Sequence, residues 1–129
     1  MTPKIIAALS LLLLASCATI APPAKTGSVD HVVLVWLKSP GSEKDRKALL
    51  AQGNDLRAIP GIHFLDSGTA LPSERPTVDD SFDIAYVMRF ESPAALEAYA
   101  VHPIHVKAKD TLLALSRKVL VYDIRSNTK

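Results

Sequence analysis

Four runs of apolar residues have the lengths and spacings of β-strands. The first is apolar almost without interruption, which is typical of a strand buried on both faces, whereas the third alternates strictly. In the second run the alternation predicts Ile62, Phe64 and Asp66 on one face. The four strands are expected over Val29–Leu37, Ile62–Gly68, Phe82–Phe90 and Val119–Ile124.

Two helical segments separate these strands. The first is expected to begin after Ser42, an N-cap with an acidic residue three positions later, and to end before Pro60. The second opens after Ser92, with proline at its first helical position. It breaks at Pro103, restarts there and continues to about Ser116.

The resulting order is β-α-β-β-α-β, which predicts an α+β, ferredoxin-like fold: a four-stranded antiparallel sheet with both helical segments on one face. The first strand offers apolar residues to both faces, for example Val33 on one and Leu34 on the other. A bare apolar sheet face is rarely tolerated in a monomer, so we expect the sheets of two chains to pair as a homodimer. The pattern leaves open which of the two sets lies on the helix-free face.

The N-terminus has the pattern of a secretory signal. Ten of the eleven residues over Ile5–Ala15 are apolar, too short a run to cross a bilayer but typical of a signal peptide over residues 1–16. The tetrapeptide that ends at Cys17 resembles the bacterial lipobox, which implies lipidation of Cys17. By the same resemblance, Ala18 implies sorting to the outer membrane, on the periplasmic side of the cell envelope. The alternative is an ordinary cleavable signal in which Cys17 is incidental.

Residues 17–28, rich in proline and small polar residues, are expected to form a flexible tether to one folded domain over residues 29–126. The chain of 129 residues has a net charge of +2 and no basic run, which argues against binding to nucleic acid. One cysteine and four histidines fit no zinc-finger spacing, and no cofactor-binding motif is present. We therefore expect neither a metal nor a cofactor.

Candidate chemistry gathers where the second helical segment restarts. His102 and His105 are three residues apart, Tyr99 lies one turn earlier, and His31 opens the first strand. If these side chains share a pocket, they can act as general acids and bases. The structural alternative makes His102 a helix cap, Tyr99 a core residue and His31 a strand-end residue.

The same residues fall in a wider pattern that resembles the stress-responsive dimeric α/β-barrel (Dabb) family. The resemblance covers residues 31–124, and its most specific part is the Tyr-x-x-His-Pro-x-His run over Tyr99–His105. It implies a ferredoxin-like protomer whose sheet pairs with that of a second chain in a dimeric barrel. The remaining matches are His31–Lys38, Ile59–Ile62, Gly68, Ser81–Asp83 and Val121–Asp123.

For activity the resemblance implies less. Most members are stress-associated proteins of unassigned biochemistry, and a minority resemble plant polyketide cyclases that close a ring by aldol condensation without a cofactor. In those enzymes the tyrosine and the second histidine of the run act together, which implies Tyr99 and His105 here, with His31 lining the same cavity. Related barrels also include haem proteins, but the sequence selects no axial histidine. The first hypothesis is therefore an envelope lipoprotein that binds a small apolar ligand; the alternative is a cofactor-independent enzyme of the cyclase type.

Overall fold

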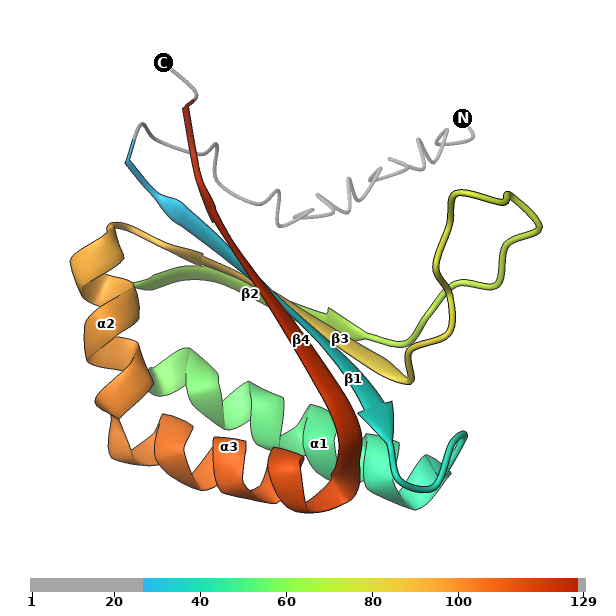
Figure 1. Cartoon of the computed structure of the whole chain (residues 1–129). Coiled ribbons are helices and arrows are strands. Elements are labelled where there is room, and N and C mark those ends of the chain that lie inside the picture. Colours follow the sequence, from blue (N-terminus) through green and yellow to red (C-terminus); the bar gives the residue numbers. More distant parts are fainter. Residues whose placement is uncertain (1–26, 128–129) are drawn as a thin grey trace, which may run out of the picture.

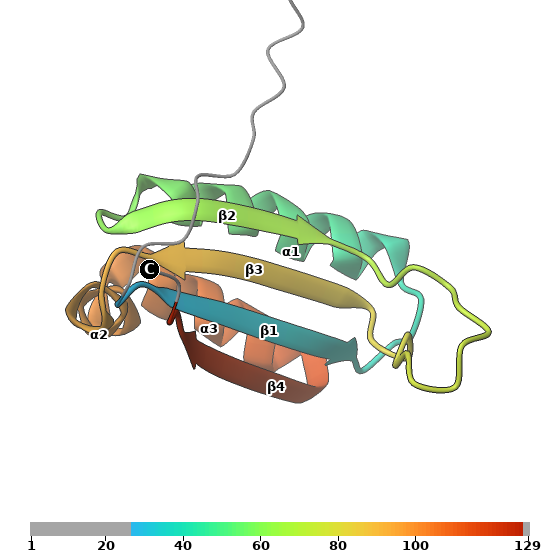
Figure 2. The same cartoon turned by 90° about the horizontal axis from the view of Figure 1, so that it is seen from above.

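A single antiparallel sheet carries all the helices on one of its faces (Figures 1 and 2). The computed structural model describes residues 27–127, so the predicted signal peptide, Cys17 and most of the tether lie outside the described residues. The strand order is β2-β3-β1-β4. The elements are β1 (Val29–Leu37), α1 (Glu43–Asp55), the short 3-10 helix η1 (Leu56–Ala58), β2 (Ile62–Gly68), β3 (Ile84–Phe90), α2 (Pro93–Val101), α3 (Pro103–Leu115) and β4 (Ser116–Arg125). This arrangement confirms the ferredoxin-like fold.

The predicted helix caps are present. The Ser42 hydroxyl accepts a hydrogen bond from the backbone N–H of Asp45 at 3.3 Å, and the Ser92 hydroxyl accepts one from Ala95 at 3.2 Å. These bonds satisfy backbone donors that the first turn of a helix leaves unpaired. Within the described residues, no helix is long and apolar enough to cross a membrane.

The second strand departs from the predicted alternation. Its register with β3 shifts between Ile62 and Phe64, so that Leu65 pairs with Met88 and is buried in the core. The prediction that Ile62, Phe64 and Asp66 share one face is therefore wrong, because an extra residue inverts the alternation that follows it. Three strand limits also differ from the predicted ones, since β3 begins at Ile84 and β4 runs from Ser116 to Arg125.

The buried core lies between the sheet and the helices and settles the question of the two faces. On β1 the odd-numbered residues face the helices, as Val33 and Val35 do, and on β3 the residues opposite them, Tyr86 and Ile84, are also buried. The even-numbered residues of β1 lie on the helix-free face. That face carries Val32, Leu34, Phe64, Ala85, Val87, Leu120, Tyr122 and Ile124.

Two polar features mark the helix-free face. Asp30 and Arg89 form a two-pronged ion pair, with Nε–Oδ1 and Nη2–Oδ2 distances of 2.7 and 3.1 Å. At the other end of β1, Trp36 is covered by the loop before β3: its indole N–H donates to the Ser81 hydroxyl at 2.9 Å. The ammonium of Lys118 lies 4.1 Å from the centre of the indole ring. Trp36 is consequently buried although no helix covers it.

The end of this loop is anchored by a buried carboxylate. Asp83 accepts hydrogen bonds from the backbone N–H groups of Leu37 at 2.9 Å and Gly41 at 2.8 Å, and from the Arg46 guanidinium at 3.1 Å. Burial raises the pKa of Asp83, but these donors outweigh that effect and hold the pKa below its usual value. One side chain thus ties together β1, the turn after it and α1.

Candidate functional site

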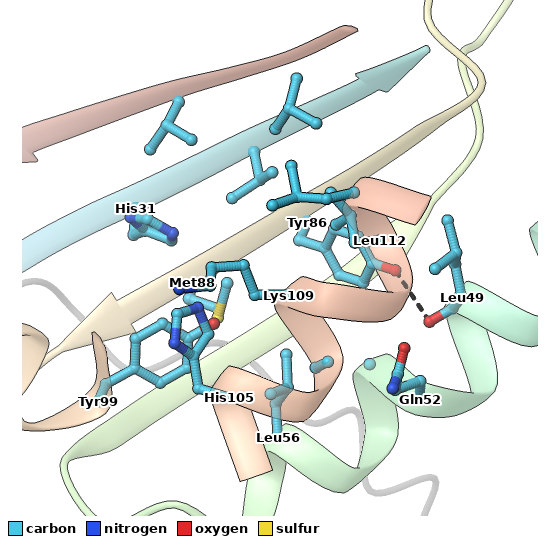
Figure 3. A pocket seen from close by; sticks show the side chains of 16 residues that line it. His31, Leu49, Gln52, Leu56, Tyr86, Met88, Tyr99, His105, Lys109 and Leu112 are labelled. Carbon is cyan, nitrogen blue, oxygen red and sulfur yellow. Dashed lines mark hydrogen bonds between the residues drawn. The ribbon is translucent and has the colours of Figure 1, made fainter. Parts of the chain in front are cut away.

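A cavity of about 310 Å³ lies between the sheet and the helices (Figure 3). Its wall is mainly apolar and comes from β1, β3, β4 and all the helices, with residues such as Val33, Leu49, Leu56, Met88 and Leu112. The polar side chains of His31, Tyr99 and His105 also line this cavity. The structure therefore brings together three of the four residues singled out in the sequence.

The break between α2 and α3 positions two of these side chains. Tyr99 is in the last turns of α2 and His105 in the first turn of α3, and their ring centres are 4.1 Å apart. His31 reaches the same place from β1, with its ring centre 6.0 Å from that of Tyr99. The Tyr99 ring also packs on Phe90, at 4.9 Å between centres, which holds it against the sheet.

His105 has one ring nitrogen engaged by the backbone. Its Nδ1 lies 3.0 Å from the carbonyl oxygen of Ala100, and because a carbonyl only accepts, Nδ1 must carry the hydrogen. In the neutral ring, Nε2 then keeps its lone pair. Burial lowers the pKa of His105; the hydrogen bond to the Ala100 carbonyl opposes this effect, and the proximity of Lys109 and His31 adds to it. The imidazole is thus neutral at pH 7 and able to accept a proton.

Tyr99 has the complementary property. Burial, with a further contribution from Tyr86, raises the pKa of Tyr99 well above its ordinary value, so the hydroxyl keeps its proton at any physiological pH. No hydrogen bond from this hydroxyl to another group in the described part of the chain is found. It remains available as a donor to a molecule in the cavity.

His31 is oriented by a residue of the neighbouring strand. Its Nδ1 lies 2.5 Å from Oδ1 of Asp123, which stands directly opposite it in the register of β1 and β4. The carboxylate accepts the hydrogen of Nδ1 and so fixes the ring, which makes T-shaped contacts with Phe90 and Tyr99. Asp123 is half exposed, so this pair lies at the rim of the site.

A close contact shapes the cavity on the side of α1. Tyr86 donates its hydroxyl to the backbone carbonyl of Leu49 at 2.8 Å, and burial raises the pKa of Tyr86 to about 12. A Cβ atom at Gly53 would come within 2.6 Å of Cε1 in the Tyr86 ring. The glycine therefore lets the helix backbone approach the aromatic ring.

His102, which was predicted to line the pocket, lies elsewhere. Its Nδ1 accepts a hydrogen bond from the backbone N–H of Ile104 at 3.3 Å, so it caps α3, as the structural alternative proposed. His63 is exposed and lies 3.3 Å from the Glu91 carboxylate. In the described part of the chain, no three His, Cys, Asp or Glu side chains are grouped as a metal site would require.

Sequence reasoning missed two residues that the site uses. Lys109 follows His105 by four positions, and this helical spacing places both on the cavity side of α3. Asp123 lies two residues after Val121 on β4, and strand alternation directs both toward the helices. Spacing alone could have found both, once the elements were known.

The comparison with protein families agrees with the ferredoxin-like fold described above. The family model described as the stress-responsive A/B barrel domain, Dabb, matches residues 29–126. The chain belongs to this family. A search of curated proteins finds no match.

Solved structures of similar Dabb and ferredoxin-like proteins match most of the chain. A dimeric ferredoxin-like protein of unknown function from Jannaschia sp. is 26% identical, with a TM-score of 0.65, over 78% of this chain and 100% of that one. A Dabb family protein from Mesorhizobium loti is also 26% identical, with a TM-score of 0.64, over 80% and 100%. The hydroxynitrile lyase of Passiflora edulis is 24% identical, with a TM-score of 0.71, over 81% and 98%, a similarity that establishes a shared fold.

Proposed function

We propose that this Dabb protein is an envelope lipoprotein that acts as a homodimer and binds a small, mostly apolar ligand in the cavity of each protomer. The observation that carries the proposal is the cavity itself, an apolar chamber into which Tyr99, His105 and His31 all face. Apolar walls with a few convergent polar groups are the usual features of a small-molecule site.

The size of the cavity limits the ligand. Its volume of about 310 Å³ is roughly twice that of the engineered cavity that binds benzene. A single aromatic ring with a short side chain, or an aliphatic chain of similar size, fits this volume. A polar group on the ligand would face the Tyr99 hydroxyl and the Nε2 lone pair of His105.

The proposed homodimer rests on the helix-free face. Its apolar side chains include Val87, Tyr122 and Ile124, each more than a third exposed in the single protomer. Contiguous apolar surface of this kind marks an interface, and similar proteins are described as dimeric.

The envelope location rests on the N-terminal sequence. In our proposal Cys17 carries the lipid and becomes the first residue of the mature chain. Cys17→Ser should leave the precursor uncleaved or release the protein from the membrane fraction. If the variant matures and fractionates like the parent, the lipoprotein proposal is wrong.

A second candidate function is favoured by the tautomer of His105. Nε2 of a neutral imidazole can take a proton from a carbon next to a carbonyl, while the bond's electron pair moves onto the carbonyl oxygen. Tyr99, a protonated donor, would stabilise the resulting enolate, and His31 would orient the substrate. Attack of the enolate carbon on a second carbonyl forms the new carbon–carbon bond and restores the first carbonyl, and the resulting alkoxide takes the proton back from Nε2 of His105. The aldol reaction therefore balances without a cofactor.

A measurement of thermal stability tests the binding function. We expect 3-phenylpropanamide, a neutral apolar probe, to raise the melting temperature of the parent, since a ligand that binds only the folded state stabilises it. Leu112→Trp fills the cavity and should abolish the shift, whereas Leu71→Trp, on an exposed loop, should retain it. Equal shifts in both variants would refute binding in the cavity.

The enzymatic candidate has its own assay. The protein should speed the exchange of α-hydrogens of 4-phenylbutan-2-one for deuterium in D2O, followed by NMR. His105→Gln should return the rate to that of buffer. If the parent gives no acceleration while the probe still binds, the protein is a binding protein and the aldol proposal fails.

A further inference from the structure

Among the residues that line the cavity, Lys109 alone has a side chain that is permanently charged at neutral pH. It lies one helical turn after His105 on α3. Figure 3 shows its side chain running from α3 toward the end of the cavity where His31 and His105 lie. The like charge of Lys109 contributes to the lowered pKa of His105, which agrees with an ammonium group near that imidazole.

The ammonium group lacks a countercharge. No carboxylate lines the cavity, and no salt bridge joins Lys109 to any acidic residue in the described part of the chain. The acidic group closest to the site along β4 is Asp123, and its Oδ1 is already held by His31. Lys109 is exposed in the protomer, so water solvates its ammonium until an anion in the cavity takes the place of that water.

We propose that the ligand is a small apolar carboxylate, with its negative charge between the ammonium of Lys109 and the hydroxyl of Tyr99. The proposal rests on the function proposed above and adds the chemical class of the ligand. The apolar body of the acid would lie against Leu49, Leu56 and Leu112, and its carboxylate would pair with the ammonium of Lys109.

The number of donors favours a carboxylate over other polar groups. A carboxylate has one charge and two acceptor oxygens, which match one ammonium and one hydroxyl. A phosphate would bring a second negative charge for which the cavity lining supplies no second permanent cation. A neutral amide or alcohol would gain no hydrogen bond between opposite charges from Lys109, whose ammonium would stay in water.

The usual alternative for such a lysine is that its stem covers apolar surface while its head reaches into water. In that case the charge of a ligand would have no effect on its affinity. The two explanations therefore differ in a measurable quantity, the ratio of the affinities for a charged and a neutral ligand of the same shape.

The experiment compares 3-phenylpropanoate with 3-phenylpropanamide, which have the same number of non-hydrogen atoms, by calorimetric titration. We expect the carboxylate to bind the parent about tenfold more tightly or better, the usual effect of a hydrogen bond to a charged group. Lys109→Met should remove this preference without weakening the amide, and Lys109→Arg should retain it. Lys107→Met is the matched control, because Lys107 lies on the same helix but outside the cavity lining, and it should change neither affinity.

Each contrary result has one meaning. If the amide binds as tightly as the carboxylate, the ligand class is wrong while the binding function stands. If the preference survives in Lys109→Met, Lys109 does not recognise the charge and the assignment is overturned. If neither probe binds the parent, both the ligand class and the binding function fail.

Discussion

The hydrogen bond from His105 to the Ala100 carbonyl decides what this side chain can do. It places the hydrogen on Nδ1, and burial keeps the ring neutral, so Nε2 can accept a proton from the cavity. Tyr99 has the opposite role, because burial keeps its proton on the hydroxyl. A base and a donor thus share one apolar site, and their ring centres are 4.1 Å apart.

The lowered pKa of His105 predicts a loss of stability in mild acid. As the pH falls through the ordinary histidine pKa of about 6.5, the unfolded chain takes up a proton that the folded protein still excludes. The contribution of His105 is therefore complete above that pH and declines below it. We expect the free energy of unfolding, from urea titrations at pH 7.5 and pH 5, to fall more for the parent than for His105→Gln. Equal declines would show that His105 titrates alike in the two states.

The close contact at Gly53 predicts that replacing this helical glycine with alanine lowers the free energy of unfolding, the reverse of the usual effect. Alanine normally stabilises a helix interior by about 1 kcal/mol relative to glycine. At Gly53 the new methyl group would press on a Tyr86 ring that its own hydrogen bond to Leu49 holds in place. We expect Gly53→Ala to lower the free energy of unfolding by about 1–2 kcal/mol, within the range for overpacking. In a Tyr86→Leu background the same change should stabilise; a loss there too would locate the strain elsewhere.

At the scale of the elements, sequence patterns predicted the order, the types and most limits of the strands and helices. They did so because caps and apolar periodicity are local: Ser42 and Ser92 act within one turn of chain. The inverted face of β2 could not be predicted, because the extra residue before Leu65 depends on the register with β3. The early start of β4 also depends on pairing, since Ser116 joins the sheet opposite Leu37.

The candidate site was predictable to a similar degree. Helical spacing and family resemblance indicated Tyr99 and His105, and His31 followed from its place on the first strand. His102 was misplaced because the same spacing fits a cap and a cavity residue, and the direction of the restarted helix decides between them. Asp83 was missed because its three donors come from Leu37, Gly41 and Arg46, which are distant in sequence and reach it only in the folded chain.

The anchoring of the loop by Asp83 can be tested by substitution. Asp83→Asn preserves the shape of the side chain but removes its charge, and it replaces one acceptor oxygen with a donor that faces Arg46 or an N–H. We expect a loss of about 1–3 kcal/mol in the free energy of unfolding, the cost of leaving buried donors unsatisfied. The control is Glu74→Gln on the exposed part of the same loop, with an expected change within about 0.5 kcal/mol. Similar effects in both variants would mean that Asp83 does not anchor the loop.

In the whole protomer, the two faces of the sheet have different roles. The helix-covered face encloses the cavity, and the helix-free face carries the apolar residues assigned to the dimer. The Asp30–Arg89 ion pair also lies on this face. In a dimer this pair would lose water, and its two-pronged geometry limits the cost because the atoms that face each other remain hydrogen-bonded.

The dimer can be tested with two valines of similar exposure. Val87 on the helix-free face is 39% exposed, and Val106 on α3 is 37% exposed. Val87→Asp would bury an unpaired charge in the interface at a cost of several kcal/mol, so it should sediment as a folded monomer at micromolar concentration. Val106→Asp should remain a dimer. A dimeric Val87→Asp variant would exclude this face as the interface.

The position of Trp36 has an optical consequence. It is the only tryptophan of the chain, and it lies on the face of the sheet opposite the cavity, beneath the loop that contributes Ser81. Its fluorescence therefore reports on the loop and on whatever packs over that face, and a ligand in the cavity does not touch the indole. Lifting the loop would expose the ring to water and shift its emission to the red. The fluorescence of Trp36 thus reports on events at the helix-free face and does not depend on whether a ligand occupies the cavity.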